Sequence, residues 1–121
     1  MHEEISSKAI DILKNLEEVD KIILYGSVLR GDYNKNSDID LAFICDDFYR
    51  NFPLDIEGNP NGLRQKIDDS LKEIQEKHNI KIQVPIYWNQ DFEKRIALLP
   101  ARNNQINYLN DIGKIVYNSQ N

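Results

Sequence analysis

The sequence predicts an α/β fold in which helices alternate with short strands. Apolar residues recur at helical spacing over residues 3–18 and again over residues 63–78, and two apolar runs of strand length lie between these stretches. A chain of 121 residues has the size at which one hydrophobic core forms. Residues 1–121 are therefore expected to make a single domain.

The first third of the chain is expected to form one helix and two strands. The helix over residues 3–18 presents one apolar face, made by Ile5, Ala9, Ile12, Leu13 and Leu16. Lys21–Tyr25 has the length and apolar content of a strand buried on both faces, and it ends at Gly26, where the chain is expected to turn. Ile39–Cys45 repeats this pattern after a segment rich in turn residues, so the two runs are predicted to be neighbouring strands.

Residues 46–62 are predicted to be irregular, because proline and glycine recur through them. They nevertheless carry five large apolar side chains, namely Phe48, Tyr49, Phe52, Leu54 and Ile56. Long loops in compact domains are often functional, so two interpretations stand. These side chains cover the end of the core, or they form a lid or a surface for a partner.

The remaining elements alternate in the same way. A helix is predicted over Leu63–His78, with Asn79 as its stop. The strand Ile80–Trp88 is expected at an edge or with a bulge, because Pro85 cannot donate a hydrogen bond to a neighbouring strand. Two shorter helices and a last strand complete the prediction, over Asp91–Leu99, Ala101–Asn110 and Lys114–Tyr117.

Charge and composition exclude several classes of protein. The formal net charge of −5 argues against nucleic acid as a partner, since binding it normally requires a basic face. The apolar runs are too short to span a membrane, and Met1–Glu4 is acidic where a signal peptide is basic, so a cytoplasmic protein is expected. Cys45 is the only cysteine, which excludes an intrachain disulfide and places it most naturally in a core strand.

The segment after the first strand has the features of a phosphate-binding loop. Gly26 lacks a Cβ atom, so the backbone can turn sharply and approach a phosphate closely, and Ser27 adds a hydroxyl donor. Arg30 follows about one helical turn later and could contact the same phosphates or hold the loop in place. Gly31 permits the chain to leave a short helix in a left-handed conformation.

Two aspartates stand at the start of the second strand. Asp38 and Asp40 are two residues apart, so their side chains emerge on the same face of a strand, and Ser37 could cap or orient the pair. Adjacent carboxylates repel each other unless a cation lies between them. A hard divalent ion such as Mg²⁺ suits oxygen ligands and keeps positions open for substrate phosphates. The pattern therefore predicts a metal and nucleotide site.

Taken together, these motifs resemble a known family. A strand, Gly26-Ser27, the Arg30-Gly31 step and then Asp38-Ile39-Asp40 leading into an apolar strand are similar to the nucleotidyltransferases of the DNA polymerase beta superfamily. The chain looks most like the minimal nucleotidyltransferases, and the likeness is specific over Lys21–Cys45. The resemblance implies a small mixed β-sheet with helices packed mainly on one face.

The resemblance also implies an activity, which is the transfer of a nucleoside monophosphate, most naturally AMP, from ATP or another NTP to an acceptor hydroxyl. It implies that Gly26 and Ser27 hold the triphosphate and that Asp38 and Asp40 bind Mg²⁺ or Mn²⁺. Active members of the family usually carry a third carboxylate on a later strand. Here Gln83 is the expected occupant of that position, and its neutral amide can neither take a proton nor add negative charge.

Two functions in different classes follow. Minimal nucleotidyltransferases resemble the antitoxin half of toxin and antitoxin pairs, in which a helical HEPN-domain protein is the partner and receives AMP on a hydroxyl side chain. Alternatively, the chain is a binding module that keeps the fold and neutralises its partner by forming a complex, as the missing third acid and the apolar residues of 46–62 suggest. Transfer to a small molecule is a third interpretation, and the sequence leaves open whether the chain forms a homo-oligomer.

Overall fold

Strands and helices alternate in a computed structural model that describes residues 1–60, 62–97 and 99–120. Five strands form one mixed sheet: β1 (Val19–Tyr25), β2 (Ile39–Cys45), β3 (Ile82–Gln83), β4 (Ile86–Trp88) and β5 (Lys114–Asn118). The order is β3-β2-β1-β5, and β4 pairs with β2 beyond the end of β3. β1 is antiparallel to β2 and β5, whereas β3 and β4 run parallel to β2. The predicted α/β class and the pairing of the first two strands are confirmed.

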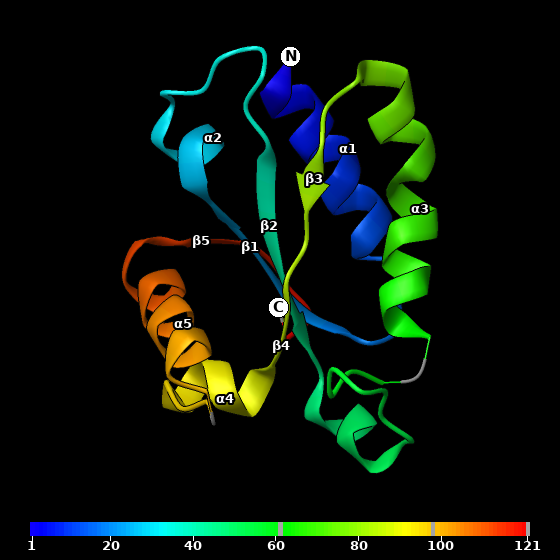
Figure 1. The fold of residues 1–121 in the computed structure, drawn as a ribbon, viewed down its shortest axis with the longest axis vertical. Coiled ribbons are helices and arrows are strands. Elements are labelled where there is room, and N and C mark those ends of the chain that lie inside the picture. The colour runs from blue at the N-terminus through cyan, green and yellow to red at the C-terminus, as the bar shows by residue number, and fades with distance from the viewer. Residues whose placement is uncertain (61, 98, 121) are drawn as a thin grey trace.

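Helices lie on both faces of this sheet. They are α1 (His2–Leu13), α2 (Gly26–Arg30), α3 (Leu63–His78), α4 (Asn89–Lys94) and α5 (Pro100–Ile112), together with a 3₁₀ helix, η1, at Asp47–Asn51. Figure 1 shows α1 and α3 on one side of the strands and α4 and α5 on the other. The larger core lies on the α1 and α3 side, as the resemblance implies, and the layer made by α4 and α5 is an addition to that expectation.

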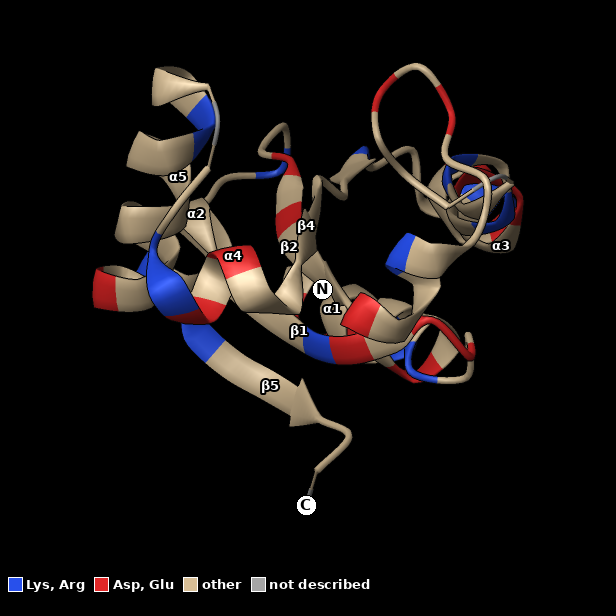
Figure 2. Cartoon of the chain, turned by 90° about the horizontal axis from the view of Figure 1, so that it is seen from below, with Lys and Arg blue, Asp and Glu red and all other residues tan. Residues whose placement is uncertain are grey.

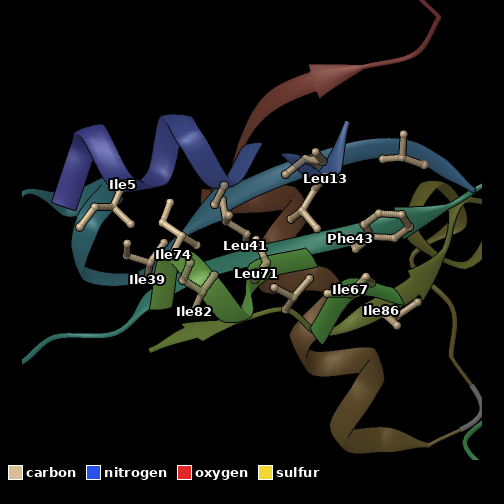
Figure 3. Packing of buried hydrophobic residues seen from close by; sticks show 14 of the residues in the cluster. Ile5, Leu13, Ile39, Leu41, Phe43, Ile67, Leu71, Ile74, Ile82 and Ile86 are labelled. Atoms are coloured by element: carbon tan, nitrogen blue, oxygen red, sulfur yellow. The ribbon is translucent and has the colours of Figure 1, made fainter. Parts of the chain in front are cut away.

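Alternation along β2 explains how one strand serves two cores. Ile39, Leu41 and Phe43 point toward α1 and α3, where they pack with α3 residues such as Leu71 (Figure 3). Ala42, the residue between two of them, points toward α4 and α5. Successive side chains of a strand face opposite sides, so a strand buried on both faces must be apolar throughout. Cys45 is fully buried at the end of this strand, as expected.

Three predicted elements differ from the structure. The helix expected over Asp91–Leu99 is α4, which begins at Asn89 and ends at Lys94, because Arg95 adopts the left-handed conformation that stops a helix. The first helix ends at Leu13 and not at residue 18. Beyond it, the Asn15 side chain donates to the Asp11 carbonyl oxygen, and the Leu16 amide donates to the Leu13 carbonyl oxygen in a tighter turn. The strand expected over Ile80–Trp88 is divided into β3 and β4. Pro85 lies between them and has no N–H to donate, although its carbonyl oxygen still accepts the Phe43 amide at 2.9 Å. None of the helices within the described ranges is long and apolar enough to cross a membrane.

Candidate functional site

The turn at Gly26 and the carboxylate of Asp40 are in direct contact. Gly26 has a φ angle of +77°, in the left-handed region that favours glycine. A Cβ atom added there would overlap a carboxylate oxygen of Asp40 and would lie 3.1 Å from its Cγ. Asp40 comes this close because it pairs with Tyr25, the last residue of β1, across the sheet. The glycine is therefore required both by the backbone conformation and by the side chain that lies against it.

Asp38 and Asp40 stand at the start of β2, and red bands mark acidic residues on this strand in Figure 2. Their spacing of two residues puts both side chains on the same face. Ile39 between them is fully buried in the core on the opposite face, which fixes the direction of both carboxylates. Burial, and then the charge of Asp38, raise the pKa of the Asp40 carboxyl, while Arg30 opposes this shift. Burial and the nearby Asp40 charge also raise the pKa of the Tyr25 phenol. A cation beside the pair would relieve this repulsion.

Gln83 faces the pair from the neighbouring strand. It is aligned with Asp40 in the parallel pairing of β2 and β3, and its amide Nε2 donates to Asp38 Oδ2 at 2.6 Å. A neutral amide thus occupies the position in which the family resemblance calls for a third acid. Its hydrogen bond holds the Asp38 carboxylate toward β3.

The other sequence-predicted residues surround this centre without touching the pair directly. The Ser27 carbonyl oxygen accepts from the Gly31 amide at 2.9 Å, and this bond caps the C-terminal end of α2. Arg30 Nε lies 3.1 Å from Asp32 Oδ2, and this contact raises the pKa of the guanidinium. Ser37 Oγ accepts from the Asn34 amide at 3.0 Å, so this hydroxyl closes a turn. Of the two roles considered for Arg30, the one visible in the structure is to hold the loop.

His2 supports the aspartate segment and was missed by sequence reasoning. It is buried in the first turn of α1, and its Nε2 donates to the Ser37 carbonyl oxygen at 3.0 Å. Its ring lies against Tyr33, with 4.7 Å between ring centroids. These contacts tie α1 to the loop that leads into Asp38. No local pattern announces them, because the partners are 35 residues apart in the chain.

The residues present fit a magnesium ion that is completed by its substrate. Among the described residues, no three His, Cys, Asp or Glu side chains gather in a way that could hold a metal by themselves. Asp38 and Asp40 nevertheless supply two hard oxygen donors on one face. Mg²⁺ is usually held by one or two carboxylates together with water and substrate phosphates. The pair can serve such an ion when a triphosphate lies on the Gly26 side.

The apolar side chains of residues 46–62 support both interpretations given above. Tyr49 of η1 packs against the main core, as a side chain covering the end of the core would. Phe48 and Phe52 are 59% and 47% exposed and lie against each other, with ring centroids 5.5 Å apart. Ile56 is fully exposed. Most of this segment therefore forms an apolar surface.

The chain is similar to one known family of proteins and to solved structures of the same fold. The family model described as polymerase beta, nucleotidyltransferase matches residues 7–91. No curated protein sequence matches. A protein from Sulfolobus solfataricus described as a nucleotidyltransferase is similar in structure, with a TM-score of 0.57 and 10% identity over 97% of this chain and 80% of the other. A toxin–antitoxin structure with AMP-PNP gives a TM-score of 0.54 and 18% identity over 99% of this chain and 76% of that one.

Proposed function

This chain belongs to the polymerase beta nucleotidyltransferase family, and from that premise we propose that residues 1–121 act as one domain that transfers AMP from ATP to a hydroxyl group of a partner protein. The observation that carries the proposal is the contact of the Gly26 turn with Asp40, beside Asp38. It brings a backbone able to approach phosphates next to two carboxylates able to hold Mg²⁺. The likeness to a toxin–antitoxin structure with AMP-PNP supports a cytoplasmic antitoxin with a helical HEPN-type partner.

The chain's own residues would act mainly by positioning. Gly26 and Ser27 would hold the triphosphate at the start of α2, where the first backbone N–H groups have no partner within the helix. Asp38 and Asp40 would hold the ion, and Arg30 and Ser37 would keep the flanking loop in place. A bound Mg²⁺ supplies charge neutralisation at the phosphate oxygens.

In the transfer itself, the acceptor oxygen forms a bond to the α-phosphorus. The bond from that phosphorus to the bridging oxygen breaks, and pyrophosphate leaves with the electron pair. Gln83 has no basic atom that could take the hydroxyl proton, so the proton leaves to water. General base catalysis typically contributes about 10²–10⁴-fold, so a slow enzyme is expected.

The test is incorporation of α-labelled ATP with Mg²⁺ into the product of the neighbouring reading frame, purified with this chain. Asp38→Asn should abolish it. Asp69→Asn is the matched control, because Asp69 also accepts a glutamine amide, at 2.7 Å from Gln65, on an exposed part of α3. Equal incorporation by the two variants, or none by the unmodified protein with Mg²⁺ or Mn²⁺, would refute the proposal.

One observation favours a second function, in which the chain neutralises a partner by forming a complex without transfer. Phe48 and Phe52 expose a contiguous aromatic surface, while Gln83 replaces an acid at the site. Exposed apolar patches often mark protein interfaces. Phe48→Ser with Phe52→Ser should then release the partner, whereas Asp38→Asn should leave the complex intact. The opposite pattern would exclude this function.

A further inference from the structure

The order of the strands gives the aspartate pair two distinct sides. β2 lies between β1 and β3, so the Gly26 turn borders the pair from the β1 side and Gln83 borders it from the β3 side. In phosphoryl transfer the attacking and leaving oxygens lie roughly in line. The proposed function places the triphosphate on the Gly26 side, and the present inference rests on that placement. The acceptor then has to approach from the side of Gln83.

A cavity of about 420 Å³ includes Gln83 in its lining on that side and reaches across to Tyr25 of β1. Its lining joins the site to the edge of the sheet and to two helices, through Tyr25, Gln83, Tyr87, Arg64, Arg102 and Gln105. Gln83, which binds Asp38, stands at the end next to the pair. The chain carries net negative charge, yet two guanidinium groups border this cavity. Its electrostatic preference therefore differs from that of the molecule as a whole.

Arg102 is positioned to bind a carboxylate. Its Nη2 donates to the Ile86 carbonyl oxygen at 2.6 Å, and its guanidinium carbon lies 4.5 Å from the centroid of the Tyr87 ring. No ion pair joins it to a carboxylate side chain within the described ranges, whereas Arg64 pairs with Asp68. A guanidinium has five N–H donors, so several of those on Arg102 are left for a ligand. Because the group is already fixed, binding a carboxylate costs little side-chain entropy.

The edge strand beside the cavity is closed to another strand. The outward carbonyl oxygens of Val84 and Ile86 accept from Arg64 and Arg102, and the outward Ile82 amide donates to Gln75 Oε1 at 2.8 Å. A polypeptide lying here cannot pair with these backbone groups, which is the usual mode of binding at a sheet edge. It has to be recognised through its side chains.

A second cavity, of about 440 Å³, continues past Arg102. It shares Tyr87 and Arg102 with the first cavity. Its lining adds the apolar side chains of Trp88, Ile96 and Leu99, and also Glu57 and the ion pair of Arg50 and Asp91. Ile96 and Leu99 are 61% and 62% exposed, so they offer apolar area to a ligand. This end of the surface suits a large apolar side chain.

We propose that the acceptor hydroxyl belongs to an acidic segment of a partner polypeptide that lies along these two cavities. The hydroxyl group lies at Gln83, a carboxylate of the segment binds Arg102, and an apolar side chain enters the second cavity. Gln83 and Ile86 are three residues apart, which is roughly 10 Å along a strand. An extended acceptor segment therefore places its acid about three positions from the hydroxyl residue.

The test is a titration of the ¹⁵N-labelled protein, without nucleotide or metal, with two synthetic peptides. One has a central tyrosine, glutamate about three positions away on each side and an outer leucine at each end. The other has lysine in place of glutamate. We expect amide shifts at Arg102, Gln105 and Trp88 and an affinity about tenfold higher for the acidic peptide, since a hydrogen-bonded ion pair of this kind commonly supplies such a factor.

Substitutions of Arg102 test whether this residue causes the preference for the acidic peptide. Arg102→Gln should remove the preference for the acidic peptide, and Arg102→Lys should retain part of it. Arg95→Gln is the matched control, because Arg95 pairs with Asp111 outside both cavities and its loss changes the net charge equally.

The inference is overturned by equal affinity for both peptides, by no shift at these amides, or by shifts centred on Phe48 and Phe52. The two peptides are compared on the unmodified protein, so this test does not depend on how the variants fold. Peptide preference without any AMP transfer would count against the proposed function alone. Transfer without preference would count against this inference alone.

Discussion

The replacement Gln83→Glu tests whether the residue facing the aspartate pair limits metal binding. The change keeps the length of the side chain and removes the amide that donates to Asp38 at 2.6 Å. Loss of a hydrogen bond to a charged acceptor costs about 1 kcal/mol at an exposed site. Two like charges about 4 Å apart in water add roughly 1 kcal/mol of repulsion. Without metal, the free energy of unfolding should fall by about 2 kcal/mol.

With Mg²⁺ the sign should reverse, because a third carboxylate adds a ligand and a charge to the site. An ion present at 100 times its Kd stabilises the folded state by about 2.7 kcal/mol. The assay is thermal unfolding of Gln83→Glu and of the unmodified chain, in EDTA and across a series of Mg²⁺ concentrations. For a chain of this size, 1 kcal/mol corresponds to about 4 °C in Tm. In EDTA the Tm of Gln83→Glu should be lower than that of the unmodified protein, and added Mg²⁺ should raise it by more.

Gln65→Glu provides the control for this experiment. Gln65 donates to Asp69 at 2.7 Å on the exposed face of α3, so the same chemical change occurs away from the site. The reasoning is wrong if Mg²⁺ stabilises Gln83→Glu no more than Gln65→Glu, or if Gln83→Glu loses no stability in EDTA.

Three further outcomes are expected. Gly26→Ala should lower the free energy of unfolding by more than the roughly 1–2 kcal/mol that a left-handed conformation costs an alanine. Gly58→Ala, at φ +82° and with nothing near its Cβ position, should lose only that amount. Equal losses in chemical denaturation would contradict the contact of Gly26 with Asp40. Burial and Asp38 raise the pKa of Asp40, so the folded state binds this proton more tightly than the unfolded state and stability falls as pH rises through that window. Asp40→Asn should therefore raise Tm at pH 7 in EDTA, with a gain that fades below about pH 4, and a gain independent of pH would refute the assignment. His2→Ala should weaken Mg²⁺ binding and His2→Gln, whose amide can also donate to Ser37, should restore part of it; unchanged affinity in both variants would deny His2 a positioning role.

Elements whose signals are local could be predicted from the sequence. The helix over Leu63–His78 has the predicted limits, because its apolar stripe is regular and Asn79 adopts the left-handed conformation that ends it. The effect of Pro85 on its strand was expected from the missing N–H. The end of α1 was not, because the turn after Leu13 is set by the need to reach β1 and by the Asn15 side chain.

The same distinction applies to the candidate site. Gly26, Asp38 and Asp40 are close in sequence, and their spacing predicted that they lie together. The contacts of His2 and Arg102 were not predicted, since they depend on how distant elements pack. A single histidine or arginine in a helix carries no signal of that packing.

The most direct test of the metal and nucleotide site is paramagnetic broadening by Mn²⁺ in the presence of AMP-PNP, recorded on the ¹⁵N-labelled protein. The amide resonances of Gly26 and Ser27 and those from Asp38 to Leu41 should broaden first, and Asp38→Asn with Asp40→Asn should abolish the effect. Broadening centred on another acidic segment, such as Asp68 and Asp69, or broadening that survives both substitutions, would contradict the account.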